Sequence, residues 1–486
     1  MLRTEKLKMI NASEYYTGLF DAGEETLEKL ISAALGNGGS YADLYFENTV
    51  SRNLLLRDGI VSTGGLNVDY GMGVRTLKGE KTGYAYSEST EFPAMMAAAK
   101  AAATISKSVK VESETRPTVP FHGRPNPAAD RYPMLKDWRD CSAEELTPVL
   151  MKLEDMIRAK DRRAVKVMAM LSSSVSDVMM YNSRAELKYD TRPMGTVAVS
   201  VVFSDGSTIC NSHGSKSFRM GAEMLDDTLL EELASAVTRN LDDRFAAIRP
   251  KGGKMPVVMG AGSSGILLHE AMGHAFEADF NRKGQSVFAD KMGKKICAEN
   301  ISIVDDGTIK GDRGALNYDD EGVPGQKTYM VTDGVLTSYL HDRISAGFYG
   351  VRPTGNGRRE SFRYNPIPRM RATYMESGDS RPEDIIASVR KGIYVDEFSN
   401  GQVKIGEGDF TFYVKSGYLI ENGKLTSPVK DINIMGNGPE ALAGIAAVGN
   451  DGKVDDGAWT CGKGQNVPVM CGIPTVLVSS LTVGGN

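Results

Sequence analysis

Two of the five histidines in this 486-residue chain flank a single glutamate, in the segment Leu268-His269-Glu270-Ala271-Met272-Gly273-His274. Two imidazoles can bind a transition metal, and a carboxylate beside the first can accept a proton from a metal-bound water. The spacing H-E-x-x-x-H is one residue longer than the H-E-x-x-H motif of metalloproteases. This extra residue constrains the local backbone more than any other feature of the sequence.

A regular α-helix cannot turn both imidazoles toward one ion. Each residue rotates by about 100°, so positions i and i+4 lie roughly 40° apart but positions i and i+5 roughly 140° apart. A single π-turn, with its i→i+5 hydrogen bond, realigns such a pair, and Gly273 can end or bend the helix at low cost. We therefore predict a helix from about Ser264 that is distorted or ends near Gly273, with His269 and His274 converging. The alternative is two unrelated histidines near a helix end.

A catalytic zinc site usually has three protein ligands and one open position, so the two histidines need a partner. The sequence offers Cys297, Cys461, Cys471, His341, Glu277 and Asp279. Cys461 lies in the glycine-rich run Thr460-Cys461-Gly462-Lys463-Gly464-Gln465, where the backbone can approach a site closely. Cys471, between Met470 and Gly472, is closer to a buried structural cysteine. The sequence favours Cys461 and leaves the other candidates open.

The segment Gly260-Ala261-Gly262-Ser263-Ser264-Gly265 competes with this interpretation, because it matches the G-x-G-x-x-G of dinucleotide-binding folds. It follows a predicted strand and precedes a predicted helix, as that motif requires. However, no repeated βαβ pattern follows, and no acidic residue ends a second parallel strand at the expected distance. We interpret the segment as a tight strand-to-helix turn in which Ser263 or Ser264 caps the helix.

The composition excludes several classes of protein. Charged residues make up 24% and hydrophobic residues 41% of the chain, as in ordinary globular proteins. The net charge of −5 argues against nucleic acid as a partner. The N-terminal segment MLRTEKLKMINASEYY has no apolar core, and no long apolar run follows, so we expect no signal peptide and no membrane span. Five scattered cysteines fit a reducing cytoplasm, where we expect the protein.

Hydrophobic periodicity predicts an α+β fold with a strand-and-helix N-terminal domain, residues 1–248. Helices are expected at about 21–36, 91–105, 142–160 and 228–240, the third with a capping box at Ser142 and Glu145. Short strands fill the intervals. Residues 106–140 are polar and contain prolines, so we expect a linker in which His122 is solvated. The order of elements suggests two similar units, about 21–105 and 142–240.

A boundary near residues 249–253 leaves a β-rich C-terminal domain, residues 249–486, which carries the metal-site helix. The strand Val257-Val258-Met259 leads into the glycine turn and the histidine helix. Turn signals at Asp306-Gly307, Asp333-Gly334 and Asn422-Gly423 each predict a hairpin. The alternation in Phe410-Thr411-Phe412-Tyr413-Val414 predicts a half-buried strand.

Several long runs carry a family resemblance: LLHEAMGHAFEADFNRKGQSVFA, VDDGTIKGDRGALNYDDEGVPGQ, PTGNGRRES, YLIENGK and CGKGQ. They resemble the metal-dependent peptidase subunit of the TldD/PmbA (TldE) family, densely over the C-terminal half and more loosely over the N-terminal half. The resemblance implies that His269, His274 and Cys461 bind zinc and that Glu270 is the catalytic base. It also implies the active branch of the family, because PmbA-like partner subunits lack the motif.

The function implied is metal-dependent hydrolysis of unfolded peptides, by a dimer formed with a PmbA/TldE-like subunit or with a second copy. A thiolate ligand favours zinc and leaves ferrous iron open. The cluster Arg358-Arg359-Glu360, with Arg352, is expected either to contact substrate or partner or to form a solvated surface loop. The alternative function is a binding protein, like a DNA gyrase modulator, whose metal is structural. Such a site would be closed by four ligands.

Overall fold

A computed structural model describes residues 12–105, 130–404 and 406–485. Most of the expected linker, with His122, lies outside these residues. The described part is α+β, as predicted, and its C-terminal half is rich in strands. Among the described helices, none combines the length and the apolar character that a membrane crossing requires.

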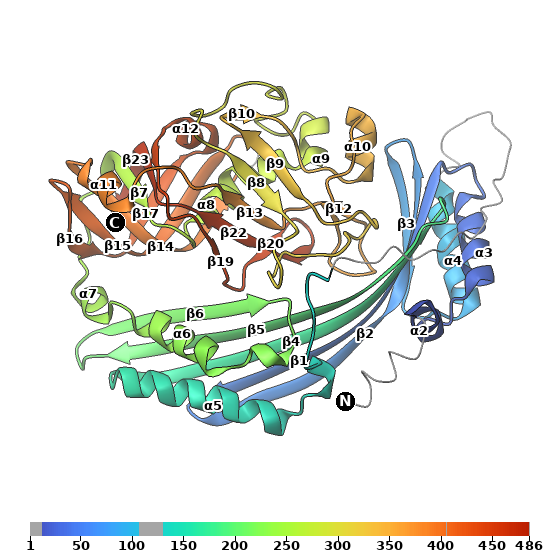
Figure 1. The fold of residues 1–486 in the computed structure, drawn as a ribbon, viewed down its shortest axis with the longest axis horizontal. Coiled ribbons are helices and arrows are strands. Elements are labelled where there is room, and N and C mark those ends of the chain that lie inside the picture. Colours follow the sequence, from blue (N-terminus) through green and yellow to red (C-terminus); the bar gives the residue numbers. More distant parts are fainter. Residues whose placement is uncertain (1–11, 106–129, 405, 486) are drawn as a thin grey trace.

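The N-terminal half forms one six-stranded antiparallel sheet with the order β3-β2-β1-β4-β5-β6 (Figure 1). Its strands are β1 (Tyr41–Arg57), β2 (Ile60–Lys78), β3 (Lys81–Ser87), β4 (Ala164–Asn182), β5 (Leu187–Ser204) and β6 (Ile209–Phe218). Its helices are α2 (Ala12–Leu19), α3 (Glu24–Leu35), α4 (Phe92–Ala103), α5 (Ala143–Lys160), α6 (Asp227–Thr238) and α7 (Leu241–Ala246), with the 3-10 turns η2 (Trp138–Asp140) and η3 (Ala222–Met224). The two expected units have the same order, helix, three strands, helix, and share this sheet. The domain boundary itself stays a prediction.

The strands are longer than their apolar segments suggested. The sequence predicted short strands, but β1 runs unbroken from its apolar segment 44–46 through polar residues to its apolar segment 54–56. That polar stretch pairs with an equally polar stretch of β4, for example Ser51 with Ser174 and Asn53 with Ser172. Backbone pairing therefore continues where no apolar side chain marks a strand. The sheet ends in tight turns such as Asp58-Gly59, where both residues have positive φ (48° and 76°).

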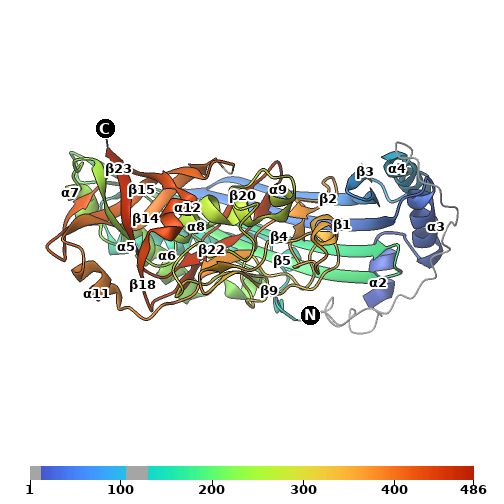
Figure 2. The same ribbon diagram turned by 90° about the horizontal axis from the view of Figure 1, so that it is seen from above.

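Alternation along the strands directs one face of the sheet to helices and the other to the C-terminal half. On β1, Leu44 and Phe46 pack against α3 and α4, whereas Tyr45 lies in a cluster with Phe362 from the C-terminal half. The helices α5 and α6 cover the sheet opposite the C-terminal half, and α3 and α4 cover the end that projects beyond it (Figures 1 and 2). The capping box predicted at Ser142 and Glu145 is present at the start of α5.

The C-terminal half contains two larger sheets. The first has the order β10-β9-β8-β13-β22-β19, from β8 (Ile303–Asp306), β9 (Lys327–Thr332), β10 (Val335–Leu336), β13 (Ala372–Met375), β19 (Lys453–Asp455) and β22 (Met470–Ile473). The second joins β7 (Gly253–Met259), β14 (Lys391–Val403), β15 (Asp409–Glu421), β16 (Lys424–Val429), β17 (Ile432–Asn437), β18 (Ile445–Val448) and β23 (Val476–Gly485). In it, β14, β7, β23, β17 and β15 pair in a closed cycle, because β15 also pairs with β14.

Two short strand pairs and several short helices complete this half. The pairs are β11 (Gly357–Arg358) with β12 (Ile367–Pro368) and β20 (Thr460–Gly462) with β21 (Asn466–Pro468). The helices are α8 (Gly265–Leu268), α9 (Ala278–Arg282), α10 (Arg343–Tyr349), α11 (Pro382–Ala387) and α12 (Gly438–Ala443). The large core of this half packs the end of α8 against the closed cycle of strands.

Two of the three predicted hairpin turns are confirmed. Asp333-Gly334 joins β9 to β10 and Asn422-Gly423 joins β15 to β16, each with positive φ at both residues. The hairpin predicted at Asp306-Gly307 is wrong. β8 ends at Asp306 and pairs with β9, but the chain returns only at Lys327 after a long excursion toward the N-terminal sheet. The alternation predicted over 410–414 is confirmed within β15.

Candidate metal centre

The histidine pair lies on a helix that changes its pitch. The α-helix α8 continues as the π-helix η4 (His269–Gly273) and then as the 3-10 turn η5 (His274–Phe276). The backbone N–H of His274 donates to the carbonyl of His269, which is the i→i+5 bond of a π-turn. The two imidazole centroids lie 5.1 Å apart. The distortion predicted from the spacing is confirmed.

Glycines fix the position of this helix by their lack of a side chain. Gly273 keeps right-handed helical angles, so it does not end the helix. Glycine is required there because a side chain would collide with Met370: an added Cβ would lie 3.2 Å from Cε of Met370 and nearer still to its sulfur. At Gly265 an added Cβ would lie 2.7 Å from the Cα of Gly472 on β22. The predicted serine cap is absent, because Ser264 makes no capping bond and its buried hydroxyl has no hydrogen-bond partner among the described residues. The glycine segment is a strand-to-helix turn, as interpreted.

Cys461 reaches the histidines from the short strand pair β20–β21. Its Sγ lies 3.2 Å from Nε2 of His274, and the ligand atoms of Cys461, His269 and His274 all lie within 4.8 Å of one another. Arg369 anchors the strand pair, because its guanidinium donates to the carbonyls of Cys461 (2.6 Å) and Gln465 (2.8 Å). All three candidate ligands are 3% exposed or less.

The donor set fits a zinc-like ion. Ligand atoms at zinc bond lengths lie roughly 3.5 Å apart in a tetrahedron, close to the spacing here. Both ring nitrogens of His269 are buried and make no hydrogen bond within the described part of the chain. Burying an unsatisfied polar group costs about 1–3 kcal/mol, and a bound ion would remove this cost for one nitrogen. Two imidazoles and a thiolate suit zinc better than magnesium or calcium.

Glu277 fixes the orientation of the second histidine. Its Oε2 lies 2.9 Å from Nδ1 of His274, which directs Nε2 of the same ring toward Cys461. Lys463, 3.0 Å from the same carboxylate oxygen, and Arg369, 3.8 Å from the other, compensate the buried charge of Glu277. From the sequence, Glu277 was considered only as a candidate metal ligand. The H-x-x-E spacing of His274 and Glu277 was the local signal for this supporting role.

The electrostatics of the cluster favour a thiolate. Burial raises the pKa of Cys461, but the neighbouring imidazoles of His269 and His274 outweigh it and lower that pKa to about 4. Burial also raises the pKa of Glu277, but the opposite effect of Lys463 and His274 is larger and lowers that pKa to about 2. The thiol of Cys461 and the carboxylate of Glu277 are therefore both charged at neutral pH.

The remaining candidates lie apart from the cluster. Cys297 lies in the core, where burial raises the pKa of its thiol to about 12. Cys471 is buried on β22, and after burial itself the nearby carboxylates of Asp455 and Glu270 raise its pKa further. Asp279 forms an ion pair with Lys463, with 2.7 Å between Oδ1 and Nζ. His341 packs against aromatic rings elsewhere.

Glu270 follows His269 directly in η4 and is partly exposed, unlike the two histidines. Its carboxylate is therefore available for proton transfer at the edge of the cluster.

The expectation of a solvated Arg358-Arg359 loop is wrong. Arg358 and Arg359 are 3% and 5% exposed and bind groups within the protein. Arg359 lies 4.2 Å over the ring of Tyr45 and donates to the carbonyl of Asp320, so it joins the N-terminal sheet to the C-terminal half. Arg352 is exposed.

Comparison with known proteins gives consistent matches along the chain. Residues 42–106, 136–244 and 252–485 match the family models described as PmbA/TldA metallopeptidase domain 1, central domain and C-terminal domain. A metalloprotease TldD homolog of Haemophilus influenzae is 39% identical over 92% of this chain and 93% of its own length. A metalloprotease of Methanothermobacter thermautotrophicus is 32% identical over 92% of this chain and 95% of its own length.

Solved structures show the same fold at lower identity. A proposed modulator of a DNA gyrase from Thermotoga maritima aligns with a TM-score of 0.75 over 95% of this chain and 100% of its own, at 22% identity. TldE from Thermococcus kodakarensis aligns with a TM-score of 0.73 over 95% of this chain and 100% of its own, at 20% identity. At such identities the likeness supports the fold alone.

Proposed function

This chain belongs to the PmbA/TldD family of metallopeptidases, and we propose that it hydrolyses unfolded peptides at a zinc centre formed by His269, His274 and Cys461. The convergence of these three buried side chains from segments 187 residues apart carries the proposal. A zinc metalloprotease TldD homolog of Saccharolobus solfataricus, 30% identical over 60% of this chain and 65% of its own length, supports the choice of metal. Ferrous iron is the alternative ion for the same ligands.

A zinc ion at this centre would supply Lewis acidity for a peptide carbonyl and lower the pKa of a coordinated water. His274 would bind through Nε2, because Nδ1 donates to Glu277. Cys461 would bind as a thiolate and thereby reduce the charge at the centre. The three ligands leave one tetrahedral position for substrate or water.

Glu270 is proposed as the general base and acid. It accepts a proton from the attacking water and delivers the proton to the leaving amine nitrogen. Its position beside His269, at the partly exposed edge of the buried cluster, permits both transfers. Transfer by a positioned carboxylate contributes about 10²–10⁴-fold to the rate.

Replacing Glu270 by Gln tests this assignment. We expect Glu270→Gln to bind as much zinc as the unchanged chain and to lose at least about 10²-fold in hydrolysis of unfolded casein. Glu299→Gln is the matched control, since Glu299 is exposed and forms an ion pair with Lys295 on the surface. Zinc content by elemental analysis and peptide release with and without chelator are the measurements. Full activity of Glu270→Gln would contradict the mechanism.

We further propose that the chain forms a dimer, with a TldE-like subunit or with itself. Within the described residues, β3 covers β2 only from Met72 to Lys78, which leaves the edge of the first part of β2 without a strand partner. That part also exposes Ile60, Val61, Leu66 and Val68. Exposed apolar strand edges pair readily with another chain. Light scattering of purified protein, with Leu66→Lys and with added TldE-like subunit, measures the assembly; a monomer in every mixture would contradict the proposal.

A regulatory binding protein with a structural metal is the competing function, because structural neighbours are described as modulators of DNA gyrase. Structural zinc is normally bound by four protein ligands. The described residues bring three candidate ligands together. Zinc bound without any cleavage, even with a TldE-like subunit present, would favour the regulatory protein.

A further inference from the structure

A cavity of about 310 Å³ lies between the N-terminal sheet and the C-terminal half, and it is lined by five arginines and three acids. The arginines come from β5, from the segments after β6 and β8, and from β11 and the residue that follows it. Its far wall is the strand pair β20–β21 that carries Cys461. The cavity thus combines a surplus of positive charge with proximity to the metal centre.

Three of these arginines form no ion pair within the described residues. The side chain of Arg219, whose residue is 7% exposed, makes one hydrogen bond, from Nε to the carbonyl of Arg313 (3.1 Å). Arg358, 3% exposed, donates to the carbonyls of Met370 and Pro468. Arg313 donates to the carbonyl of Trp459 (2.9 Å) and to hydroxyl groups, among them Oγ of Ser217. Neutral acceptors thus bind some N–H groups of these three arginines, but they do not neutralise the positive charges.

The acids of the cavity are engaged elsewhere. Asp320 binds Arg192 at 2.6 Å and accepts from the backbone of Arg359. Glu47 accepts from Thr49 and from the backbone of Phe362. Glu360 accepts from the backbone of Asn466. None of these acids forms an ion pair with Arg219, Arg313 or Arg358, whose charges are compensated only in part by the more distant carboxylates of Asp190, Asp312 and Asp320.

Such an arrangement is unfavourable in the protein alone. A buried charge is normally paired, since desolvation is costly. Burial and the neighbouring arginines lower the pKa of both Arg219 and Arg313 to about 10, and they lower the pKa of Arg358 as well. An anion in the cavity would relieve both the desolvation and the mutual repulsion of the three guanidinium groups.

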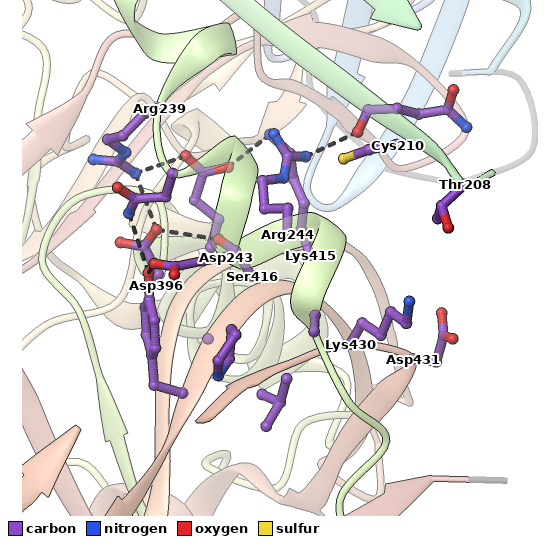
Figure 3. Close-up of a pocket in the computed structure, with 18 of the residues that line it drawn as sticks. Thr208, Cys210, Arg239, Asp243, Arg244, Asp396, Lys415, Ser416, Lys430 and Asp431 are labelled. Carbon is purple, nitrogen blue, oxygen red and sulfur yellow. Dashed lines mark hydrogen bonds and ion pairs between the residues drawn. The ribbon is translucent and has the colours of Figure 1, made fainter. Parts of the chain in front are cut away.

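A second charged hollow shows the usual pattern by contrast. The hollow between α6, α7 and the strands β14 and β15 is lined by Arg239, Asp396, Glu397 and Lys415 (Figure 3). There Arg239 binds both acids at 3.1 Å, and Lys415 binds Glu397 at 2.6 Å. The charges of these four side chains therefore compensate one another.

The cavity touches the segment that places the metal-binding cysteine. Arg313 donates to the carbonyl of Trp459 and to Oγ1 of Thr460, the two residues before Cys461. Arg358 donates to the carbonyl of Pro468, which pairs with Thr460 across the strand pair. The cavity and the metal centre therefore share the strand pair β20–β21.

We propose that this cavity binds a carboxylate of the peptide substrate, on an acidic side chain or at a free C-terminus, through Arg219, Arg313 and Arg358. The planar guanidinium group binds a carboxylate with two parallel hydrogen bonds, which makes arginine the residue suited to this ligand. The proposal rests on the proposed peptidase function and adds a preference for substrates with a negative charge near the scissile bond.

Binding to the zinc-loaded Glu270→Gln variant tests the proposal without turnover. Three labelled eight-residue peptides are compared by fluorescence anisotropy: one with a single Glu and an amidated C-terminus, its amidated Gln counterpart, and that counterpart with a free C-terminus. We expect at least one carboxylate peptide to bind tenfold or more tightly than the amidated Gln peptide. The first and third peptides separate the two sources of the carboxylate. Equal affinities for all three would overturn the proposal.

The arginine itself is tested by Arg219→Met in the Glu270→Gln background, with Arg352→Met as control because Arg352 is exposed. We expect Arg219→Met to abolish the carboxylate preference and to leave the ligand-free protein as stable or more stable to heat. An equal loss in Arg352→Met would overturn the proposal. Displacement of the labelled peptide from the Glu270→Gln protein by succinate, but not by succinamide, provides a measurement that needs no arginine variant.

The same experiments keep the two proposals separate. Cleavage by the unchanged chain without any carboxylate preference would leave the peptidase function standing and overturn the cavity assignment. A carboxylate preference in binding without cleavage of any peptide would support the cavity assignment and contradict the peptidase function.

Discussion

Replacing Glu277 by Gln isolates the contribution of one supporting carboxylate to metal binding. The change keeps the size of the side chain and removes its charge. It leaves Arg369, which is fully buried, without its acid, although Arg369 keeps the carbonyls of Cys461 and Gln465. Lys463 keeps Asp279 at 2.7 Å.

The structure sets the size of the effect. Removing one partner of a buried ion pair lowers the free energy of unfolding by about 3–5 kcal/mol. Because Lys463 and Arg369 keep other partners, we expect Glu277→Gln to lie near the lower limit, about 3 kcal/mol. Losing a group that orients a metal-binding histidine lowers metal affinity about 10- to 100-fold. Gln can still accept a hydrogen bond from Nδ1 of His274, so we expect a loss of about tenfold.

Asp279→Asn is the matched control. It also removes a carboxylate from Lys463 but leaves the contact of Glu277 with His274 intact. Zinc affinity is measured by competition with a chromophoric chelator, and stability by thermal unfolding of the metal-free protein. We expect Asp279→Asn to bind zinc within about twofold of the unchanged chain. The reasoning is refuted if Glu277→Gln binds zinc as tightly as the unchanged chain, or if Asp279→Asn weakens binding equally.

Three further predictions concern the helix, the cysteines and acid stability. Gly265→Ala places a Cβ 2.7 Å from the Cα of Gly472, about 0.8 Å inside ordinary contact, so we expect zinc affinity to fall at least about tenfold; Gly347→Ala, in open space on α10, should have no effect in the same titration. Cys461→Ala should lose zinc on dialysis, whereas Cys297→Ala should retain it and lose only stability; equal retention by both would exclude Cys461 as a ligand. Burial lowers the pKa of His341 from 6.5 to about 4, so the neutral buried ring contributes stability above pH 6.5 that is lost as the pH falls toward 4. Between pH 6.5 and 4, the free energy of unfolding of metal-free His341→Phe should fall by up to about 3 kcal/mol less than that of the unchanged chain. An equal fall in both proteins would contradict the prediction.

The parts of the site that depend on local geometry were predictable from sequence. The rotation per residue alone required the helix to be distorted or to end between His269 and His274, and the structure contains a π-turn there. The choice of Cys461 over five other candidates required the family resemblance, because no local pattern reports a contact across 187 residues. Glu277 was visible as a carboxylate three residues after His274, but its role depends on Lys463 and Arg369 from distant segments.

The parts that sequence reasoning missed are buried charges. A run such as Arg358-Arg359-Glu360 is typical of a solvated loop, since arginine is rarely buried. Here carbonyls from β21 and from the segment between β12 and β13, together with Asp320, accept its hydrogen bonds. Because these partners come from other segments, no periodicity or composition could indicate them. The same holds for β1, whose polar middle section is a strand because β4 supplies an equally polar neighbour.

The long separation between Cys461 and His274 has a consequence for the unfolded chain. An ion that ties both residues closes a loop of 187 residues, as a disulfide would. In the chain-entropy model a cross-link of that span removes about 5 kcal/mol of conformational freedom from the denatured ensemble. A zinc ion at this centre would thus act as a reversible cross-link within the C-terminal half. Zinc starvation would then act on the lifetime of the folded protein as well as on its catalysis.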